Sequence, residues 1–157
     1  MLIEKEENEK KFYKASIEGN AEEVRRLVYD QLVDVNLCFD KEEEILNWEE
    51  ILADSTALIA AVRKGHNQVV RILLDAGADI ERADKWSHCP LQWAVIDNHY
   101  ETVKLLLDAG ADVNKEDKLG RTSLLWAESK DMVDVLMEHG ARLDLEEEDN
   151  YNQTSAS

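Results

Sequence analysis

The string RILLDAGADIERAD at residues 71–84 returns almost unchanged as KLLLDAGADVNKED at residues 104–117, a separation of 33 residues. A third copy, DVLMEHGARLDLEE at 134–147, brings its glycine only 30 residues after the preceding one. A diverged first copy, KFYKASIEGNAEEVRRLVYDQLVDVN, lies at residues 11–36. A fixed period of this length indicates an array of stacked structural repeats.

A second short pattern precedes these strings and predicts another helix in each repeat. Thr56, Cys89 and Thr122, again 33 residues apart, open the stretches TALIAA, CPLQWA and TSLLWA. A threonine in this position caps a helix with its hydroxyl, and Pro90 suits the first helical position. Positions expected to end the helices in the left-handed conformation are Gly19, Gly65, Asn98, Gly77, Gly110 and Gly140. Because one helix pair cannot bury its apolar face alone, the pairs are expected to stack into one core.

These motifs resemble the ankyrin repeat over roughly residues 9–145, apart from one insertion. The resemblance implies an all-α ankyrin-repeat solenoid of four helix-turn-helix repeats, with β-hairpin-like fingers projecting between them. We expect one domain, residues 1–145, with its repeats at about 9–36, 54–83, 84–116 and 117–145.

The sequence departs from the family pattern in the repeats themselves. The histidine of the family's Thr-Pro-Leu-His motif is replaced in the four repeats by Tyr13, Ile59, Gln92 and Leu125. About three residues are missing between the two helices of the last repeat, which predicts a tight turn there. Divergent first and last repeats are expected to present polar outer faces.

An acidic insertion at residues 37–53 separates the first two repeats. Residues 40–54 carry seven acids against Lys41, and Trp48 lies among several aliphatic residues. This pattern is typical of either a short amphipathic helix or a long finger folded onto the stack. The tail, residues 146–157, is polar and aperiodic, so we expect it to be disordered.

Charge excludes several classes of partner. The 157 residues contain 18 Lys and Arg against 35 Asp and Glu, a formal net charge of −17. Nucleic acid and anionic membranes are therefore not expected to bind, whereas a protein with a basic patch complements such a surface. Two cysteines and a start, MLIEKEENEKK, without the apolar stretch of a secretory signal favour the cytoplasm or the nucleus. We expect a monomer.

The residue types of catalytic and metal sites do not gather in a recognisable motif. His88 beside Cys89 resembles the start of a metal or nucleophile site, but two adjacent ligands are too few, and Cys89 takes the capping position of a helix. In the family, His66 and His99 would bond to neighbouring backbone. We therefore predict no catalysis and no cofactor.

The four tryptophans differ in their expected roles. Trp93 and Trp126 hold equivalent places on first helices and are predicted to pack in the core. Trp86 falls near a finger tip, where it either anchors a partner or folds back on a neighbouring finger. Trp48 either pins the insertion to the stack or grips a partner.

The resemblance implies a protein-binding surface made by the fingers and first helices. Its predicted residues are Lys85, Trp86, His88, Ile96, Asp97, Lys118, Leu119, Arg121, Leu52, Ala53, Ser55, Arg63, Lys64 and Trp48. The leading hypothesis is a protein–protein interaction module that acts as an adaptor or a stoichiometric inhibitor. The alternative is an acidic chaperone or decoy for basic proteins, acting through the insertion and tail. Asn114 lies in a finger where related proteins carry hydroxylated asparagines, which makes it a candidate for hydroxylation.

Overall fold

A computed structural model of the chain describes residues 1–39 and 54–143. Seven α-helices, one 3-10 helix (η2) and two short strands make up this part. In chain order they are α1 (Leu2–Glu18), α2 (Ala21–Tyr29), β1 (Cys38–Phe39), β2 (Ser55–Thr56), α3 (Ala57–Lys64), α4 (Asn67–Asp75), α5 (Pro90–Ile96), α6 (Tyr100–Asp108), η2 (Ser123–Trp126) and α7 (Lys130–Glu138).

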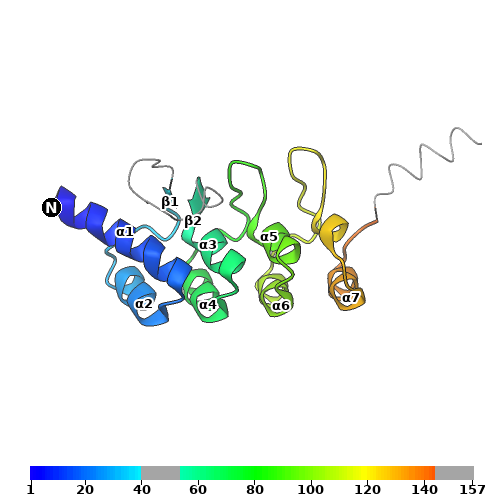
Figure 1. The fold of residues 1–157 in the computed structure, drawn as a ribbon, viewed down its shortest axis with the longest axis horizontal. Coiled ribbons are helices and arrows are strands. Elements are labelled where there is room, and N and C mark those ends of the chain that lie inside the picture. The colour runs from blue at the N-terminus through cyan, green and yellow to red at the C-terminus, as the bar shows by residue number, and fades with distance from the viewer. Residues whose placement is uncertain (40–53, 144–157) are drawn as a thin grey trace, which may run out of the picture.

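The helices form two layers along one row, which confirms the predicted helical solenoid. The first helices α1, α3 and α5 with η2 make one layer, and α2, α4, α6 and α7 make the other (Figure 1). The loops between repeats project to one side of the row. We call the loop of residues 79–89 the third finger and that of residues 112–122 the fourth finger.

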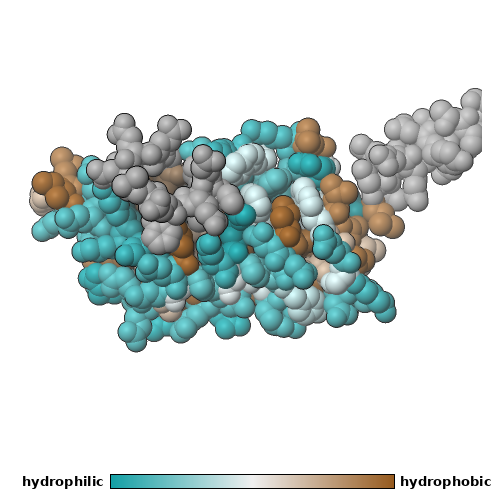
Figure 2. All heavy atoms as spheres, viewed as in Figure 1, coloured by the Kyte–Doolittle hydropathy of each residue, from teal (hydrophilic) through white to brown (hydrophobic). Residues whose placement is uncertain are grey.

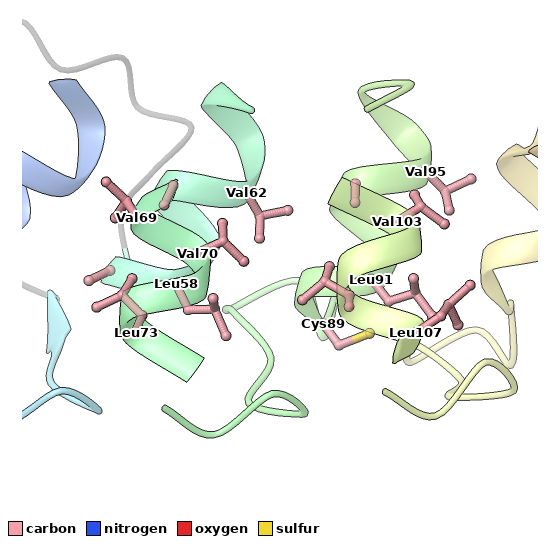
Figure 3. Close-up of a cluster of buried hydrophobic side chains, with 14 of the residues drawn as sticks. Leu58, Val62, Val69, Val70, Leu73, Cys89, Leu91, Val95, Val103 and Leu107 are labelled. Carbon is pink, nitrogen blue, oxygen red and sulfur yellow. The ribbon is translucent and has the colours of Figure 1, made fainter. Parts of the chain in front are cut away.

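The core lies between successive helix pairs. Leu58 and Val62 of α3 point toward the α5–α6 pair, and Val95 and Leu107 of that pair point on toward the last repeat (Figure 3). All four are buried. Each pair therefore covers the apolar face of its neighbour, and a single core cluster runs from Phe12 to Ala141.

The predicted caps are confirmed in the second and third repeats, whereas Thr122 makes no side-chain capping bond at the start of η2. Thr56 Oγ1 accepts a hydrogen bond from Ile59 N at 3.3 Å at the start of α3, and Pro90 is the first residue of α5. Gly65 ends α3 with a φ of 73°, and Asn98 takes the corresponding position after α5 with a φ of 56°. The short polar side chain of asparagine tolerates this left-handed conformation better than most residues do.

His66 and His99 bond to backbone, as predicted, and these bonds link successive repeats. His66 Nε2 lies 2.8 Å from the carbonyl oxygen of Ile17, and His99 Nε2 lies 2.8 Å from that of Arg63. Each imidazole packs on the glycine that ends the preceding first helix, Gly19 or Gly65. A ring on the second helix of one repeat thus satisfies a backbone group at the end of the previous repeat.

Tyr13 and Gln92 occupy the position where the family motif Thr-Pro-Leu-His has its histidine, and both make hydrogen bonds to the loop that follows their repeat. Tyr13 Oη lies 3.0 Å from Ser55 Oγ in β2, in the connection between the first two repeats. Gln92 Nε2 donates to the carbonyls of Lys115 (2.9 Å) and Arg121 (3.1 Å), at the base of the fourth finger. Burial raises the pKa of Tyr13 to about 12, so its phenol remains protonated. Both side chains tie a first helix to the finger that follows it.

The insertion leaves the stack through a short antiparallel pair. Cys38 pairs with Thr56 and Phe39 with Ser55, and the Phe39 ring lies 4.0 Å from that of Tyr13. The pair fits the predicted hairpin-like finger. Residues 40–53 and the predicted disordered tail lie outside the described residues.

The last repeat differs from both expectations for it. The missing residues shorten its first helix to the single 3-10 turn of η2 rather than tightening the turn, because Ala127 is already extended (ψ 114°) and Ser129 caps α7. The last repeat also exposes three large apolar residues, where a polar outer face was expected. Leu125, Met137 and Leu143 are 63%, 42% and 60% exposed. Apolar residues gather at this end of the row and at the start of α1 (Figure 2).

Candidate functional site

The third finger is built around one buried carboxylate at its tip. Asp84 Oδ1 accepts hydrogen bonds from Trp86 N (3.0 Å) and His88 N (3.1 Å). The backbone closes the turn with Ser87 N donating to the Asp84 carbonyl at 3.0 Å, and Ser87 is left-handed with a φ of 62°. The aspartate therefore holds Lys85 and Trp86 at the two central positions of the turn.

The fourth finger repeats this construction 33 residues later. Asp117 Oδ1 accepts from Leu119 N (2.8 Å) and Arg121 N (3.0 Å), and Gly120 takes the left-handed position with a φ of 72°. Burial alone would raise the pKa of the Asp117 carboxyl, but the backbone N–H groups of Arg121 and Leu119 and the Arg121 guanidinium outweigh it and hold that pKa below its ordinary value. Lys118 and Leu119 thus occupy the positions of Lys85 and Trp86.

Four aromatic rings form a continuous row where the fingers meet the first helices, and we call this row the aromatic ledge. Trp86 meets Trp93 edge-on with ring centroids 6.2 Å apart. His88 lies between Trp93 (5.1 Å) and Trp126 (5.3 Å), again edge-on to both. Edge-to-face pairs of this kind are favourable beyond their burial, so the row is a defined surface.

Carboxylates underneath fix the orientation of these rings. Trp93 Nε1 donates to Asp84 Oδ2 at 2.6 Å, and His88 Nε2 lies 3.3 Å from Asp117 Oδ2. The two tip aspartates therefore shape both the fingers and the ledge. Sequence reasoning missed them, although aspartate recurs 33 residues apart directly before a lysine.

Cations border the aromatic ledge. The Arg63 guanidinium lies 3.8 Å from the Trp93 ring centroid and pairs with Asp97 at 3.2 Å. Lys85 Nζ lies 4.6 Å from the Trp86 ring, and Arg121 lies 5.2 Å from Trp126. Lys118 Nζ donates to the carbonyl of Lys85 at 3.0 Å, which connects the tips of the two fingers.

Most of the described predicted surface residues lie in or beside this ledge. Trp86 is 40% exposed and Leu119 is 73% exposed, while Lys64, Lys85 and Lys118 are exposed. Ile96 and Asp97, at the end of α5, are partly buried. Trp86 contacts Trp93 of its own repeat, and its role as an anchor for a partner stays a prediction.

Trp93 and Trp126 need a correction. Both pack against the core, as predicted, yet both are only partly buried and belong to the ledge. Helical spacing alone did not separate the core side of a first helix from the side that meets the fingers.

Ser55 needs a correction too. It was predicted to contact a partner, but it is 1% exposed and bonded to Tyr13. Trp48, Leu52 and Ala53 lie outside the described residues, as do most acids of the insertion and tail.

Asn114 links two repeats through its side-chain amide. Its Nδ2 donates to the Gly140 carbonyl at 3.0 Å, and its Oδ1 accepts from Arg142 N at 2.9 Å. Asn36 makes the corresponding link earlier in the array, with Oδ1 accepting from Asp79 N at 2.7 Å. Hydroxylation of Asn114 stays a prediction, and the structure gives this side chain a role in joining repeats.

The His88–Cys89 pair does not make a nucleophilic site. Burial raises the pKa of the Cys89 thiol to about 11, so it holds its proton at neutral pH. The His88 ring is directed to Asp117. In the part of the chain that the structure describes, no three His, Cys, Asp or Glu side chains come together as a metal site requires.

None of the described helices has the length and apolar character needed to cross a membrane.

Among comparisons with known proteins, a family model described as ankyrin repeats in three copies matches residues 2–84 and 80–149, most of the chain. No curated protein matches the chain.

Proposed function

The chain belongs to the ankyrin-repeat family, and from this premise we propose that it is a binding module, an adaptor or stoichiometric inhibitor, whose protein partner docks on the aromatic ledge. Ankyrin repeats are in general protein-interaction modules and are typically not catalytic. The proposal places the binding surface on the fingers and the first helices of the repeats, rather than on the layer of second helices.

The observation that carries the proposal is an exposed tryptophan, Trp86, whose position is fixed by contacts within its own repeat. Trp86 is 40% exposed, at a finger tip fixed by Asp84, and its ring stacks edge-on against Trp93. Large aromatic side chains that are exposed yet rigid are typical anchors of interfaces, because little side-chain entropy is lost when a partner covers them.

The test compares two aromatic residues of similar exposure. Tyr100 on α6 is 37% exposed and has a lysine, Lys104, 5.7 Å from its ring, but it lies in the layer of second helices. Partners captured from a cell lysate are identified, and their affinities for purified wild type, Trp86→Ala and Tyr100→Ala are measured by calorimetry. We expect Trp86→Ala to weaken binding about tenfold or more and Tyr100→Ala less than about twofold.

The decoy hypothesis makes the opposite prediction. Partners would be basic proteins, binding would be lost at high salt, and Trp86→Ala would leave it unchanged. Removing Trp86 also removes its contact with Trp93, so thermal unfolding of each variant must show that the array is intact. Tight binding that is indifferent to Trp86 would contradict the proposed site.

A further inference from the structure

Each of the two finger tips beside the aromatic ledge exposes a lysine, in a chain whose net charge is negative. Lys85 and Lys118 are exposed there, in a protein of formal net charge −17. Among the described residues, no carboxylate forms an ion pair with either lysine. Arg121 at the end of the ledge differs, because it is paired with Asp117 at 2.8 Å.

The carboxylates of the ledge do not offset this charge at the surface. Asp84 and Asp117 are 8% and 7% exposed, and both oxygens of each accept hydrogen bonds or ion pairs from the fingers and the ledge. Asp97 is directed to Arg63. A partner that approaches the finger tips therefore meets the exposed lysines before these buried carboxylates, whose oxygens already have hydrogen-bond partners within the protein.

Cation and apolar residue alternate in the same way on both finger tips. Lys85 and Trp86 hold the two central turn positions of the third finger, and Lys118 and Leu119 hold those of the fourth. The fingers project to the same side of the row (Figure 1), and the bond from Lys118 Nζ to the Lys85 carbonyl joins their tips. The surface thus presents a pattern of charge, apolar, charge, apolar from one repeat to the next.

We propose that the partner segment is an acidic peptide in which carboxylates alternate with aromatic or aliphatic side chains. This inference rests on the proposed function and reverses the partner expected from net charge alone. The carboxylates pair with Lys85 and Lys118, and the apolar side chains cover Trp86 and Leu119. At physiological salt the screening length is about 8 Å, so the lysines at the contact outweigh the remote acids of the chain.

The experiment is a selection from a random 12-residue peptide display library on the full chain at about 0.15 M salt. Wild type, Lys85→Glu/Lys118→Glu and Trp86→Ala are used in parallel, with Arg25→Glu/Arg71→Glu on α2 and α4 as the charge-matched control. All four substituted cations are exposed, so the variants are expected to fold, which circular dichroism checks.

Acidic and apolar residues should be enriched on wild type. The best peptide, measured by fluorescence polarisation, should bind Lys85→Glu/Lys118→Glu at least about tenfold more weakly and the control variant within about threefold. Replacing its carboxylates by amides should cause a similar loss.

The remaining outcomes separate the two proposals. Enriched peptides that need Trp86 but are neutral or basic would overturn the acidic partner and leave the ledge as the site. Peptides that ignore Trp86 and both lysines would overturn the ledge itself. Acidic peptides that bind only after Glu42, Glu43 and Glu44 are changed to Gln would show that the chain's own acids occupy the ledge, which contradicts a separate partner. An oligonucleotide that binds more tightly, with the same lysine dependence, would also overturn the proposal.

Discussion

Substituting Gly19 by alanine tests how the imidazole of His66 joins the first two repeats. Gly19 ends α1 with a φ of 77°, and a Cβ built on it would lie 2.7 Å from His66 Nδ1. Ordinary contact begins at 3.4 Å, so the ring must move. Its Nε2, however, is held 2.8 Å from the Ile17 carbonyl. The substitution therefore combines backbone strain, a steric clash and a threatened hydrogen bond.

The expected loss of unfolding free energy follows from these three contributions. The left-handed conformation costs an L-residue about 1–2 kcal/mol. Crowding a packed site typically costs about 1–3 kcal/mol, and the net value of a hydrogen bond is about 0.5–1.5 kcal/mol. Gly19→Ala should thus destabilise the protein by about 2.5–6.5 kcal/mol, a large part of the stability of a domain this size.

Gly77→Ala is the matched control. Gly77 has a φ of 93° and nothing within 4 Å of the added Cβ, so only the backbone strain remains, about 1–2 kcal/mol. Urea unfolding followed by circular dichroism measures both variants, and His66→Ala completes a double-mutant cycle with Gly19→Ala. We expect a favourable coupling of about 1–2 kcal/mol between Gly19→Ala and His66→Ala. Equal losses for the two glycines, together with strict additivity in the cycle, would refute the reasoning.

Three further predictions concern buried polar groups. Gln92→Leu should lower the free energy of unfolding by about 2–4 kcal/mol, because it leaves the Cys89 N–H and the carbonyl of Lys115 without their partner; chemical denaturation measures this. Cys89, whose thiol pKa is raised to about 11 by burial, should resist Ellman's reagent until the protein unfolds, and rapid labelling of Cys89 in the native state would contradict its burial. Asp117 has a pKa lowered in the folded state, so the stability it contributes is present above its unfolded pKa of about 3.9 and is lost as the pH falls through the folded value. The difference in unfolding free energy between wild type and Asp117→Asn should therefore become smaller below about pH 4 in acid titrations. A difference that does not change with pH would contradict the idea that the ionised form of Asp117 stabilises the fold.

The period in the sequence was enough to predict the architecture. Thr56, Pro90, Gly65 and Asn98 all act as caps or turn residues, because these roles depend on local backbone geometry. The shortened last repeat was not predictable in detail, since missing residues are absorbed either by a turn or by a helix. In the structure the helix absorbs the loss, and η2 is only one 3-10 turn.

The ledge was only partly predictable, for a related reason. Trp86 was identified because a finger tip is exposed in any such array. Trp93 and Trp126 were assigned to the core because helical register alone does not show how far the fingers cover a first helix. The net charge of −17 sums over the whole chain and therefore does not predict the exposed lysines of the ledge. Only the structure shows that Asp84 and Asp117 are buried while the lysines beside them are exposed.

The histidine links also imply an order in which the array opens. His66 and His99, the N-cap residues of α4 and α6, each fasten a repeat to the one before it, whereas Ser129 holds this position in the last repeat and, among the described residues, bonds only within α7, to Met132 N. In a linear stack, stability is the sum of each unit and its junctions, so the weakest junction sets where opening starts. Amide protons of α7 should therefore exchange with solvent sooner than those of α4, and the protein would loosen from its carboxyl-terminal repeat while the first three repeats and most of the ledge remain formed.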